Sequence, residues 1–302
     1  MKHIIVISSN KWRSSKFVLL FIKELYRNFL VQLQQIYSLS EATVIADWVF
    51  EKIAGVKRTE LIKNPSLQLG NKTTGHLNQA FAQLLQHKPV QYVLGEAWFY
   101  HMKLKVNSHV LIPRPETEEL VELLVADRKS KLTDPAILDI GTGSGCIPIA
   151  IKKNLPASMV TSVDVSEDAL SLAKENAAQH NTSIRFIQMD FLDESNWSRL
   201  PRPDVIISNP PYIPLKEKDK LNKNVSGFEP HLALFVPDAS PLIFYEKIAD
   251  FGKKNLMPDG KIYLETHEEH AEEVMALFIK RYAAATIKKD MYGKERMVVV
   301  SI

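Results

Sequence analysis

The sequence contains a single cysteine, Cys146, among 302 residues. One cysteine excludes an intramolecular disulfide, which is compatible with a reducing compartment. Cys146 follows a glycine-rich stretch and precedes Ile147, Ile149 and Ile151. A thiol among apolar neighbours usually serves as a small packed side chain. We therefore predict that Cys146 is structural and is not a nucleophile.

Long apolar segments are also missing. The longest early run, Phe17 to Ile22, is far shorter than the roughly 20 residues that a membrane-spanning helix needs. A longer apolar core followed by small residues, the pattern of a secretion signal, is not visible. We therefore expect no membrane span and a cytoplasmic location, and we assign no metal site.

Charge is small overall but uneven along the chain. The formal net charge is +3, which by itself does not predict nucleic-acid binding. Residues 1–90 carry 12 Lys and Arg against 5 Asp and Glu, whereas residues 91–302 carry 26 against 30. The basic first part either faces an acidic partner such as RNA or is a solvated helical surface.

The length favours two domains. We treat residues 1–30 as an uncertain N-terminal extension with a strand candidate at 3–7, and residues 31–90 as a small all-helical domain. One helix face is indicated by apolar residues three or four positions apart, at Ile45, Ala46, Val49, Phe50 and Ile53. Ser40 is the expected N-cap of this helix and Gly55 its expected end. Two further helices are expected, at 59–62 and 75–86.

Residues 91–112 are predicted to form a β-hairpin that links the two domains. The strand pattern is carried by three apolar segments, 98–100, 104–106 and 110–112. Asn107-Ser108 is the expected turn. Prolines end this segment, and the acidic residues that follow favour the N-terminus of a helix, namely Glu116, Glu118 and Glu119.

Residues 113–302 are expected to form the second domain. From Ala136 onward, strand and helix patterns alternate, which is typical of a mostly parallel sheet with helices on both faces. The expected strands are 136–140, 159–164, 184–189, 205–208, 261–265, 285–289 and 297–301. The expected helices are 146–153, 166–180 and 268–281. The fold class is therefore α/β.

A glycine loop follows the first of these strands. The run Gly141-Thr142-Gly143-Ser144-Gly145 lets the backbone approach a ligand closely. Its third glycine comes one residue earlier than in the dinucleotide fingerprint, which disfavours an NAD enzyme. S-adenosylmethionine, which has no phosphate, fits this spacing better, and we predict that residues Gly141 to Gly145 bind it.

Acidic residues end the next two strands. Asp164 stands where a carboxylate accepts hydrogen bonds from ribose hydroxyls, although it could also simply cap the helix that begins near Ser166. Asp190 could meet the adenine amino group, and Phe191 could pack on the adenine face. Alternatively, Asp190 is an ordinary loop aspartate and Phe191 is an ordinary core phenylalanine.

The sequence Asn209-Pro210-Pro211-Tyr212 follows the strand at 205–208 and carries the chemistry. An amide nitrogen is a poor nucleophile unless acceptors hold its hydrogens while its lone pair faces the methyl group. The Asn209 side-chain oxygen and the Pro210 carbonyl can supply these acceptors, and the prolines stiffen the loop. Tyr212 can supply a flat wall for the planar amide. We predict Asn209, Pro210 and Tyr212 as catalytic residues.

Two substrates fit this motif. The exocyclic nitrogen of adenine is also planar and conjugated, so DNA or RNA adenine stays open from the motif alone. A flipped base would also need a basic channel, and the second domain is slightly acidic. A binding module that has lost its activity is a third reading, which the intact motifs disfavour.

Taken together, these segments of the sequence resemble the PrmC/HemK family of protein-glutamine N5-methyltransferases, which act on peptide chain release factors. The resemblance runs from about residue 40 and rests on Pro89-Val90-Gln91-Tyr92, Leu111-Ile112-Pro113-Arg114-Pro115-Glu116-Thr117-Glu118, Leu138 to Ile147, Asn209 to Pro214 and Glu229-Pro230. It implies a class I (Rossmann-like) seven-stranded methyltransferase domain, preceded by the small all-helical domain, which helps to bind the release factor, and the β-hairpin linker.

The resemblance also implies the partners and the roles of individual residues. The cofactor is S-adenosylmethionine, and the substrate is the glutamine of a Gly-Gly-Gln motif in a release factor. Asn209 also contacts the cofactor, and the glutamine is held by Asn209, Pro210, Pro211 and Tyr212. Arg114 and Glu116 are expected to shape the cofactor side of the site, and we assign them to substrate binding. We expect a monomer with no direct nucleic-acid partner, and a ribosomal-protein glutamine is the alternative substrate.

The sequence departs from the family pattern in two places. After Glu265 the family usually has an apolar residue and then glycine, whereas this chain has Thr266-His267. Pro237-Asp238 stands where a glycine is common. These differences affect loops near the C-terminal strands and leave the core motifs intact.

Overall fold

The computed structural model describes residues 21–129 and 134–302 of the chain. These residues form two compact units, which divide between Val90 and Gln91. The strand expected at 3–7 and most of the predicted extension at 1–30 lie outside the described residues. No helix in the described ranges is long and apolar enough to cross a membrane.

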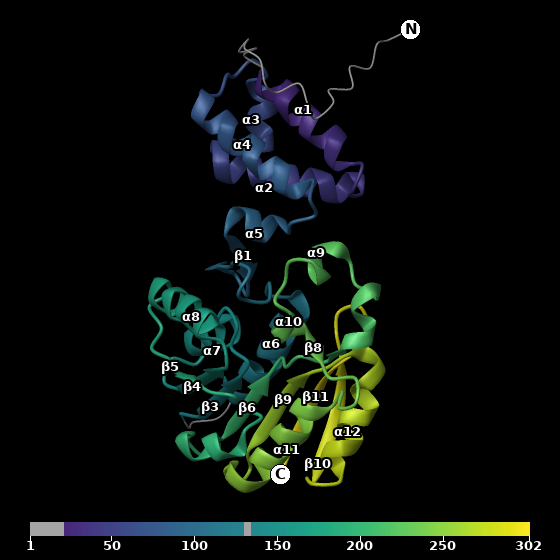
Figure 1. The fold of residues 1–302 in the computed structure, drawn as a ribbon. Helices are drawn as coiled ribbons and strands as arrows, with labels where there is room; N and C mark the ends of the chain where they lie inside the picture. The colour runs from purple at the N-terminus through teal and green to yellow at the C-terminus, as the bar shows by residue number, and fades with distance from the viewer. Residues whose placement is uncertain (1–20, 130–133) are drawn as a thin grey trace. The chain divides into compact units, whose positions relative to one another are not determined.

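The first unit is built from helices, as the sequence predicts (Figure 1). They are α1 (Ile22–Leu33), α2 (Leu39–Ala54), α3 (Arg58–Lys63) and α4 (Asn71–Leu84). Phe29 of α1 joins three of them, because its ring centroid lies 5.3 Å from that of Phe50 in α2 and 4.1 Å from that of Phe81 in α4. This aromatic cluster forms the centre of the unit.

The predicted N-cap of α2 is wrong by two residues. Ser38, not Ser40, caps the helix: its Oγ accepts a hydrogen bond of 3.2 Å from the Glu41 backbone N–H. The spacing Ser38-x-x-Glu41 is that of a capping sequence, a signal that the periodicity argument overlooked. Gly55 ends the helix as predicted, with a left-handed φ of 68°.

The second unit begins within α5 (Val90–Leu94) and continues with the hairpin of β1 (Glu96–Phe99) and β2 (Met102–Lys105). A hairpin is confirmed, but its turn is Tyr100-His101, with φ of 46° and 61°, and not Asn107-Ser108. Asn107 instead bends the chain locally, because its Oδ1 accepts from the His109 backbone N–H at 2.9 Å. The segment 110–112 forms no strand, and Val110 and Ile112 pack into the core beside β1.

A seven-stranded sheet forms the centre of this unit, in the order β10-β11-β9-β6-β3-β4-β5. The strands are β3 (Ala136–Ile140), β4 (Met159–Asp164), β5 (Arg185–Gln188), β6 (Val205–Ser208), β9 (Lys261–Glu265), β10 (Ala284–Lys289) and β11 (Glu295–Ser301). β11 pairs antiparallel with both of its neighbours, and the other pairings are parallel. The predicted seven-stranded α/β fold is confirmed.

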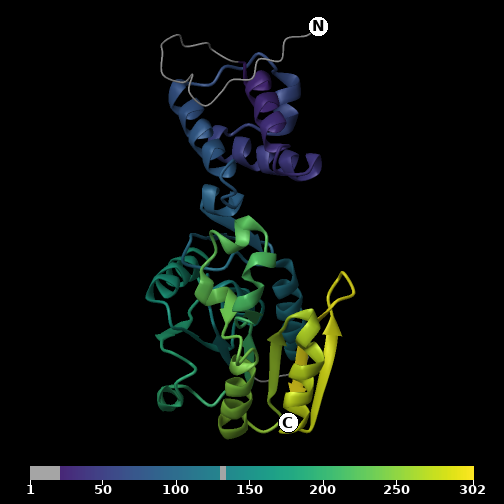
Figure 2. The same cartoon turned by 45° about the vertical axis from the view of Figure 1, so that its right-hand side comes forward.

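Helices cover both faces of the sheet (Figures 1 and 2). Alternate strand residues point to opposite faces, so Ile137 of β3 joins one core and Leu138 joins the other. On the Ile137 face lie α6 (Pro115–Lys129) and α7 (Cys146–Asn154), followed by α8 (Glu167–Gln179). On the Leu138 face lie α11 (Ile243–Asn255) and α12 (Ala271–Ile279). Cys146 packs against the core on the Ile137 face of the sheet, as predicted.

The predicted helix at 268–281 and the region before it need correction. That segment is a short 3-10 turn, Glu268–His270, followed by α12, which ends at Ile279. Helix α11 was not predicted. The short elements between β6 and α11 were not predicted either, namely β7 (Ile213–Pro214), the 3-10 turn Leu215–Lys220, α9 (Lys223–Ser226), α10 (His231–Leu234) and β8 (Phe235–Val236). A further 3-10 turn, Glu194–Arg199, follows β5.

The corrected helix cap leads to a test in the first unit. We expect Ser38→Ala to destabilise α2 by about 1 kcal/mol, because one N-terminal N–H of the helix loses its acceptor. Amide hydrogen exchange across α2, followed by mass spectrometry, should therefore accelerate. Ser40→Ala is the matched control and should change the exchange far less. A larger effect at Ser40 would restore the original assignment of the cap.

Candidate active site

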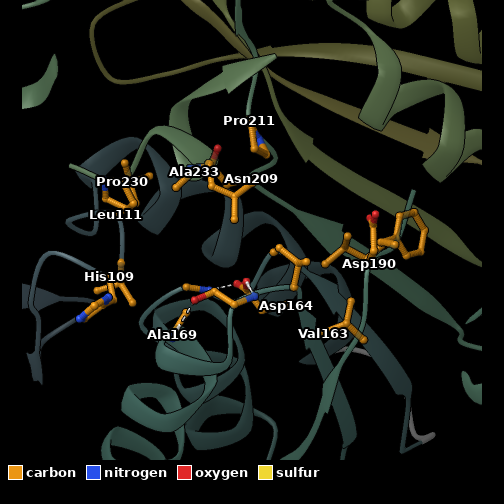
Figure 3. A pocket seen from close by; sticks show the side chains of 18 of the residues that line it. His109, Leu111, Val163, Asp164, Ala169, Asp190, Asn209, Pro211, Pro230 and Ala233 are labelled. Carbon is orange, nitrogen blue, oxygen red and sulfur yellow. Dashed lines mark hydrogen bonds between the residues drawn. The ribbon is translucent and has the colours of Figure 1, made fainter. Parts of the chain in front are cut away.

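A cavity of about 320 Å³ opens at the carboxyl ends of the parallel strands (Figure 3). β3 lies between β4 and β6. The connection after β3 leads to β4 on one side, and the connection after β5 leads back to β6 on the other side. Open α/β sheets bind ligands at such a switch point. The size of the cavity falls in the range of small-molecule sites. Residues from the predicted loops line it, namely Gly141, Gly143, Asp164, Asp190, Phe191, Asn209 and Pro211.

The glycine loop turns tightly from β3 into α7. Gly141, Gly143 and Gly145 all have positive φ, at 80°, 52° and 81°. A Cβ on Gly145 would lie 3.2 Å from the Cβ of Ala173 and from Cδ1 of Ile149, so this glycine permits close packing of α7 against α8. Gly143 has open space where a Cβ would stand. Gly145 therefore serves packing, whereas Gly141 and Gly143 face the cavity.

Asp164 ties this loop to the end of β4. Its Oδ2 accepts from the Gly143 backbone N–H and its Oδ1 from the Ser166 backbone N–H, each at 2.9 Å. Ser166, and not Asp164, is the N-cap of α8, so the simple capping role considered for Asp164 is wrong. Burial raises the pKa of Asp164, and these backbone hydrogen bonds oppose that rise. Each carboxylate oxygen has lone pairs left for a ligand.

Other predicted loop residues serve the scaffold. Thr142 and Ser144 are buried and do not line the cavity. The carbonyl of Ser144 accepts from Nδ2 of Asn176 in α8 at 2.9 Å. Phe191 is buried and packs on Trp197 and also lines the cavity, so the core and ligand readings are compatible.

Asn209 is oriented by two buried residues from distant elements. Its Nδ2 donates to Oγ1 of Thr117, in the first turn of α6, at 3.0 Å. The Thr117 hydroxyl in turn donates to Oε2 of Glu265, at the end of β9, at 2.6 Å. In the described part of the chain, no group donates to Asn209 Oδ1 or to the Pro210 carbonyl. Both acceptors that the motif predicts are therefore unengaged.

Tyr212, Arg114 and Glu116 do not line the cavity. Tyr212 is half-buried against the core that contains α11 and α12, and its ring centroid lies 6.0 Å from that of His267. Burial raises its pKa, so the phenol stays protonated at neutral pH. Arg114 pairs with the buried Glu229, with a distance of 2.5 Å between Nη2 and Oε1. Glu229 also accepts from the Ile112 backbone N–H at 3.1 Å.

Two groups of site residues were missed by the sequence reading. Buried carboxyls stand next to the loops: burial raises the pKa of both Asp139 and Glu265 to about 7. Further lining comes from His109, Leu111, Met189, Leu192, Pro230 and Ala233. Leu111 and Pro230 belong to segments that carry the family resemblance, which was the available signal. His109 follows the residues that were wrongly predicted to form the hairpin turn, and no motif marked it as a site residue.

The electrostatic character of the cavity is acidic. Asp164 and Asp190 line it, and in the described part of the chain no lining residue is Lys or Arg. A phosphate-bearing ligand would lack a counter-charge here, whereas a cationic ligand is attracted. Among residues 21–129 and 134–302, no group of three or more His, Cys, Asp or Glu could hold a metal ion.

Two family models match the chain in regions that correspond to these units. The PrmC N-terminal domain matches residues 24–95, and the methyltransferase small domain matches residues 116–225. With a seven-stranded sheet, one reversed strand and a glycine loop followed by an acidic strand end, the second unit is the catalytic domain of an S-adenosylmethionine-dependent methyltransferase.

Two relatives that align over most of the chain identify the family. A release factor glutamine methyltransferase of Flavobacterium psychrophilum is 39% identical over 93% of this chain and 99% of its own. One from Streptococcus pneumoniae is 45% identical over 73% of this chain and 77% of its own. The chain belongs to the release factor glutamine methyltransferase family, and the predicted family is confirmed. A solved protein-(glutamine-N5) methyltransferase (release factor-specific) from Alicyclobacillus acidocaldarius aligns over 66% of this chain and 98% of its own, with 24% identity and a TM-score of 0.42.

The packing role of Gly145 leads to a test of the loop. Gly145→Ala adds both left-handed strain and a crowded methyl group, and we expect it to lower the free energy of unfolding by roughly 2–5 kcal/mol. Gly293→Ala is the matched control, because φ there is 79° with nothing within 4 Å of a Cβ. It should cost only about 1–2 kcal/mol. Equal losses in chemical denaturation would contradict the close contact with α8.

Proposed function

We propose that this chain transfers the methyl group of S-adenosylmethionine to the N5 amide nitrogen of the glutamine in the Gly-Gly-Gln motif of class 1 release factors, and thereby supports translation termination. Membership of the family supports the reaction and its protein substrate. The observation that carries the chemistry is the pair of unengaged acceptors on Asn209, which lines the cavity, and on Pro210, which follows it in the chain.

The cavity is suited to the cofactor in charge and in shape. Gly141 and Gly143 let the backbone approach a ligand, and we propose that the loop from Gly141 to Gly145 surrounds its amino-acid part. Asp164 would accept from the ribose hydroxyls, Asp190 from the adenine amino group, and Phe191 would pack on the adenine. When bound, S-adenosylmethionine supplies a methyl group made electrophilic by its positively charged sulfur.

The substrate amide would be held by the loop after β6. We propose that Asn209 Oδ1 and the Pro210 carbonyl each accept one hydrogen of the glutamine amide, which leaves the nitrogen lone pair directed at the methyl group. Pro210 and Pro211 have no N–H to compete for these acceptors and restrict the loop. Tyr212 would flank the amide plane, and Pro211 lines the adjoining cavity.

Positioning does most of the catalytic work in this arrangement. Orienting two reactants can contribute up to roughly 7–11 kcal/mol to lowering a barrier. No strong general base is needed, because the methylated amide loses its extra proton readily. Arg114 supports the site through Glu229, which fixes the segment before α6. We propose that Arg114 and Glu116 contribute to substrate binding from this segment.

Several partner assignments belong to the same proposal. The helical domain at 31–90 would recognise the release factor, the linker at 91–112 would join it to the catalytic domain at 113–302, and the chain would act as a cytoplasmic monomer. The acidic cavity supports a protein amide over a nucleic-acid base as substrate, since no lining Lys or Arg is found in the described residues.

Labelled S-adenosylmethionine tests the proposed substrate directly. Incubation of the full chain with a purified release factor should label the factor, and replacement of the motif glutamine by asparagine should abolish the label. Ribosomal proteins, DNA and RNA serve as competing acceptors in parallel reactions. Label in both forms of the factor, or only in a competing acceptor, would overturn the substrate assignment.

The role of Asn209 can be separated from cofactor binding. Asn209→Ala should lower kcat on the order of 100-fold, because one acceptor for the amide is lost, while affinity for S-adenosylhomocysteine falls much less. Asn255→Ala, at the end of α11 and outside the cavity lining, is the control and should leave kcat unchanged. Equal loss of kcat and of cofactor affinity, measured by calorimetry, would assign Asn209 mainly to the cofactor.

A further inference from the structure

Three residues that are far apart in the sequence form one chain of hydrogen bonds, which runs from the cavity wall into the core. Asn209 Nδ2 donates to Thr117 Oγ1 at 3.0 Å, and Thr117 Oγ1 donates to Glu265 Oε2 at 2.6 Å. Thr117 and Glu265 are each 2% exposed, so water does not compete for the bond between them. Thr117 and Glu265 do not line the cavity, but Thr117 contacts Asn209, which does.

The proton count of this chain decides which end of the Asn209 amide faces the cavity. A threonine hydroxyl has one hydrogen, and an ionised carboxylate can only accept. The hydroxyl of Thr117 must therefore give its hydrogen to Glu265 and present a lone pair to Asn209. Only the NH₂ end of Asn209 can donate to that lone pair, so Oδ1 is left at the other end of the amide. Without such a partner the two ends are nearly equivalent in shape.

We propose that Thr117 and Glu265 are positioning residues for methyl transfer, which hold the Asn209 carboxamide with its oxygen turned to the substrate amide. This inference rests on the proposed function, because it gives the orientation of Asn209 that the substrate glutamine requires. A reversed Asn209 would present its NH₂ group to the NH₂ group of the glutamine, and two donors cannot pair. The reversed site would still bind the cofactor.

The orientation of the Asn209 amide depends on the ionisation of Glu265. Once protonated, Glu265 can donate to Thr117, and Thr117 is then free to donate to Asn209 Oδ1, which stabilises the reversed amide. Burial raises the pKa of Glu265 to about 7, and the Thr117 hydrogen bond opposes that rise. The other ionisable groups that act on or face it come from α6 and the segment before it, α7, the loop after β6, α11 and β11, namely Glu116, Arg114, Cys146, Tyr212, Tyr245 and Arg296.

A pair of substitutions at Thr117 separates orientation from packing. Thr117→Val removes the hydroxyl and keeps the branched shape, and we expect kcat to fall about 10- to 100-fold with little change in KM for the release factor or in affinity for S-adenosylhomocysteine. Thr117→Ser keeps the hydroxyl and should stay within about threefold of the wild type. Equal loss in both variants would mean a packing role alone, and a Thr117→Val variant as active as wild type would overturn the proposal.

The pH profile of kcat supplies a second readout that packing does not affect. In the wild type, kcat should fall as the pH drops through about 7, because Glu265 gains its proton there. Glu265→Gln cannot titrate, so its lower kcat should lack that acid limb. An unchanged acid limb in Glu265→Gln would show that Glu265 does not orient Asn209 by its charge.

A measurement without turnover keeps this inference distinct from the proposed function. In ¹⁵N-labelled full-length protein, the side-chain amide signal missing from Asn209→Ala identifies the Asn209 NH₂ group. Its hydrogen exchange at pH 8 should be slow in the wild type and in Thr117→Ser, and fast in Thr117→Val. If the wild type methylates no release factor but this pattern appears, the proposed substrate fails and the orientation stands. If the exchange is the same in all three proteins, the orientation fails.

Discussion

Two hydrogen-bond acceptors in the loop after β6 accept from no group in the described residues, and the proposed site depends on them. Asn209 is half-buried and its Oδ1 receives no hydrogen bond from the described residues, so other contacts must hold this acceptor and the Pro210 carbonyl in place. Here the proline ring removes a competing donor and the Thr117–Glu265 pair occupies the other end of the Asn209 amide. The open acceptors are therefore features of the folded chain before any substrate arrives.

The sheet brings these parts together. β6 delivers Asn209, β3 delivers the glycine loop and β4 delivers Asp164, all at one edge, because the three strands are parallel and adjacent. The orienting residues arrive from outside this trio, Thr117 from α6 and Glu265 from β9, the next strand of the sheet. The acidic lining complements a cationic cofactor, which accounts for the absence of lining Lys and Arg in the described residues.

Much of this could be predicted from the sequence where the signal is local. β3, β4, β6 and β9 begin and end at the predicted residues, since each carries several apolar or β-branched residues and has a clear end. The hairpin turn could not be placed, because Tyr100-His101 adopts positive φ without the glycine or asparagine that normally marks such a turn. The motif Asn209 to Tyr212 could be recognised from the sequence. The orientation of the Asn209 side-chain amide could not be predicted, because Thr117 and Glu265 lie 92 and 56 residues from Asn209 in sequence and come close to it only in the fold.

The central claim is that the loop after β6 grips a carboxamide through two acceptors. A crystal structure of the full chain with S-adenosylhomocysteine and a glutamine-containing release-factor fragment tests it most directly. The account predicts the glutamine Nε2 within about 3.2 Å of both Asn209 Oδ1 and the Pro210 carbonyl, beside the cofactor sulfur. A glutamine bound with its oxygen toward Asn209, or held away from this loop, would contradict it.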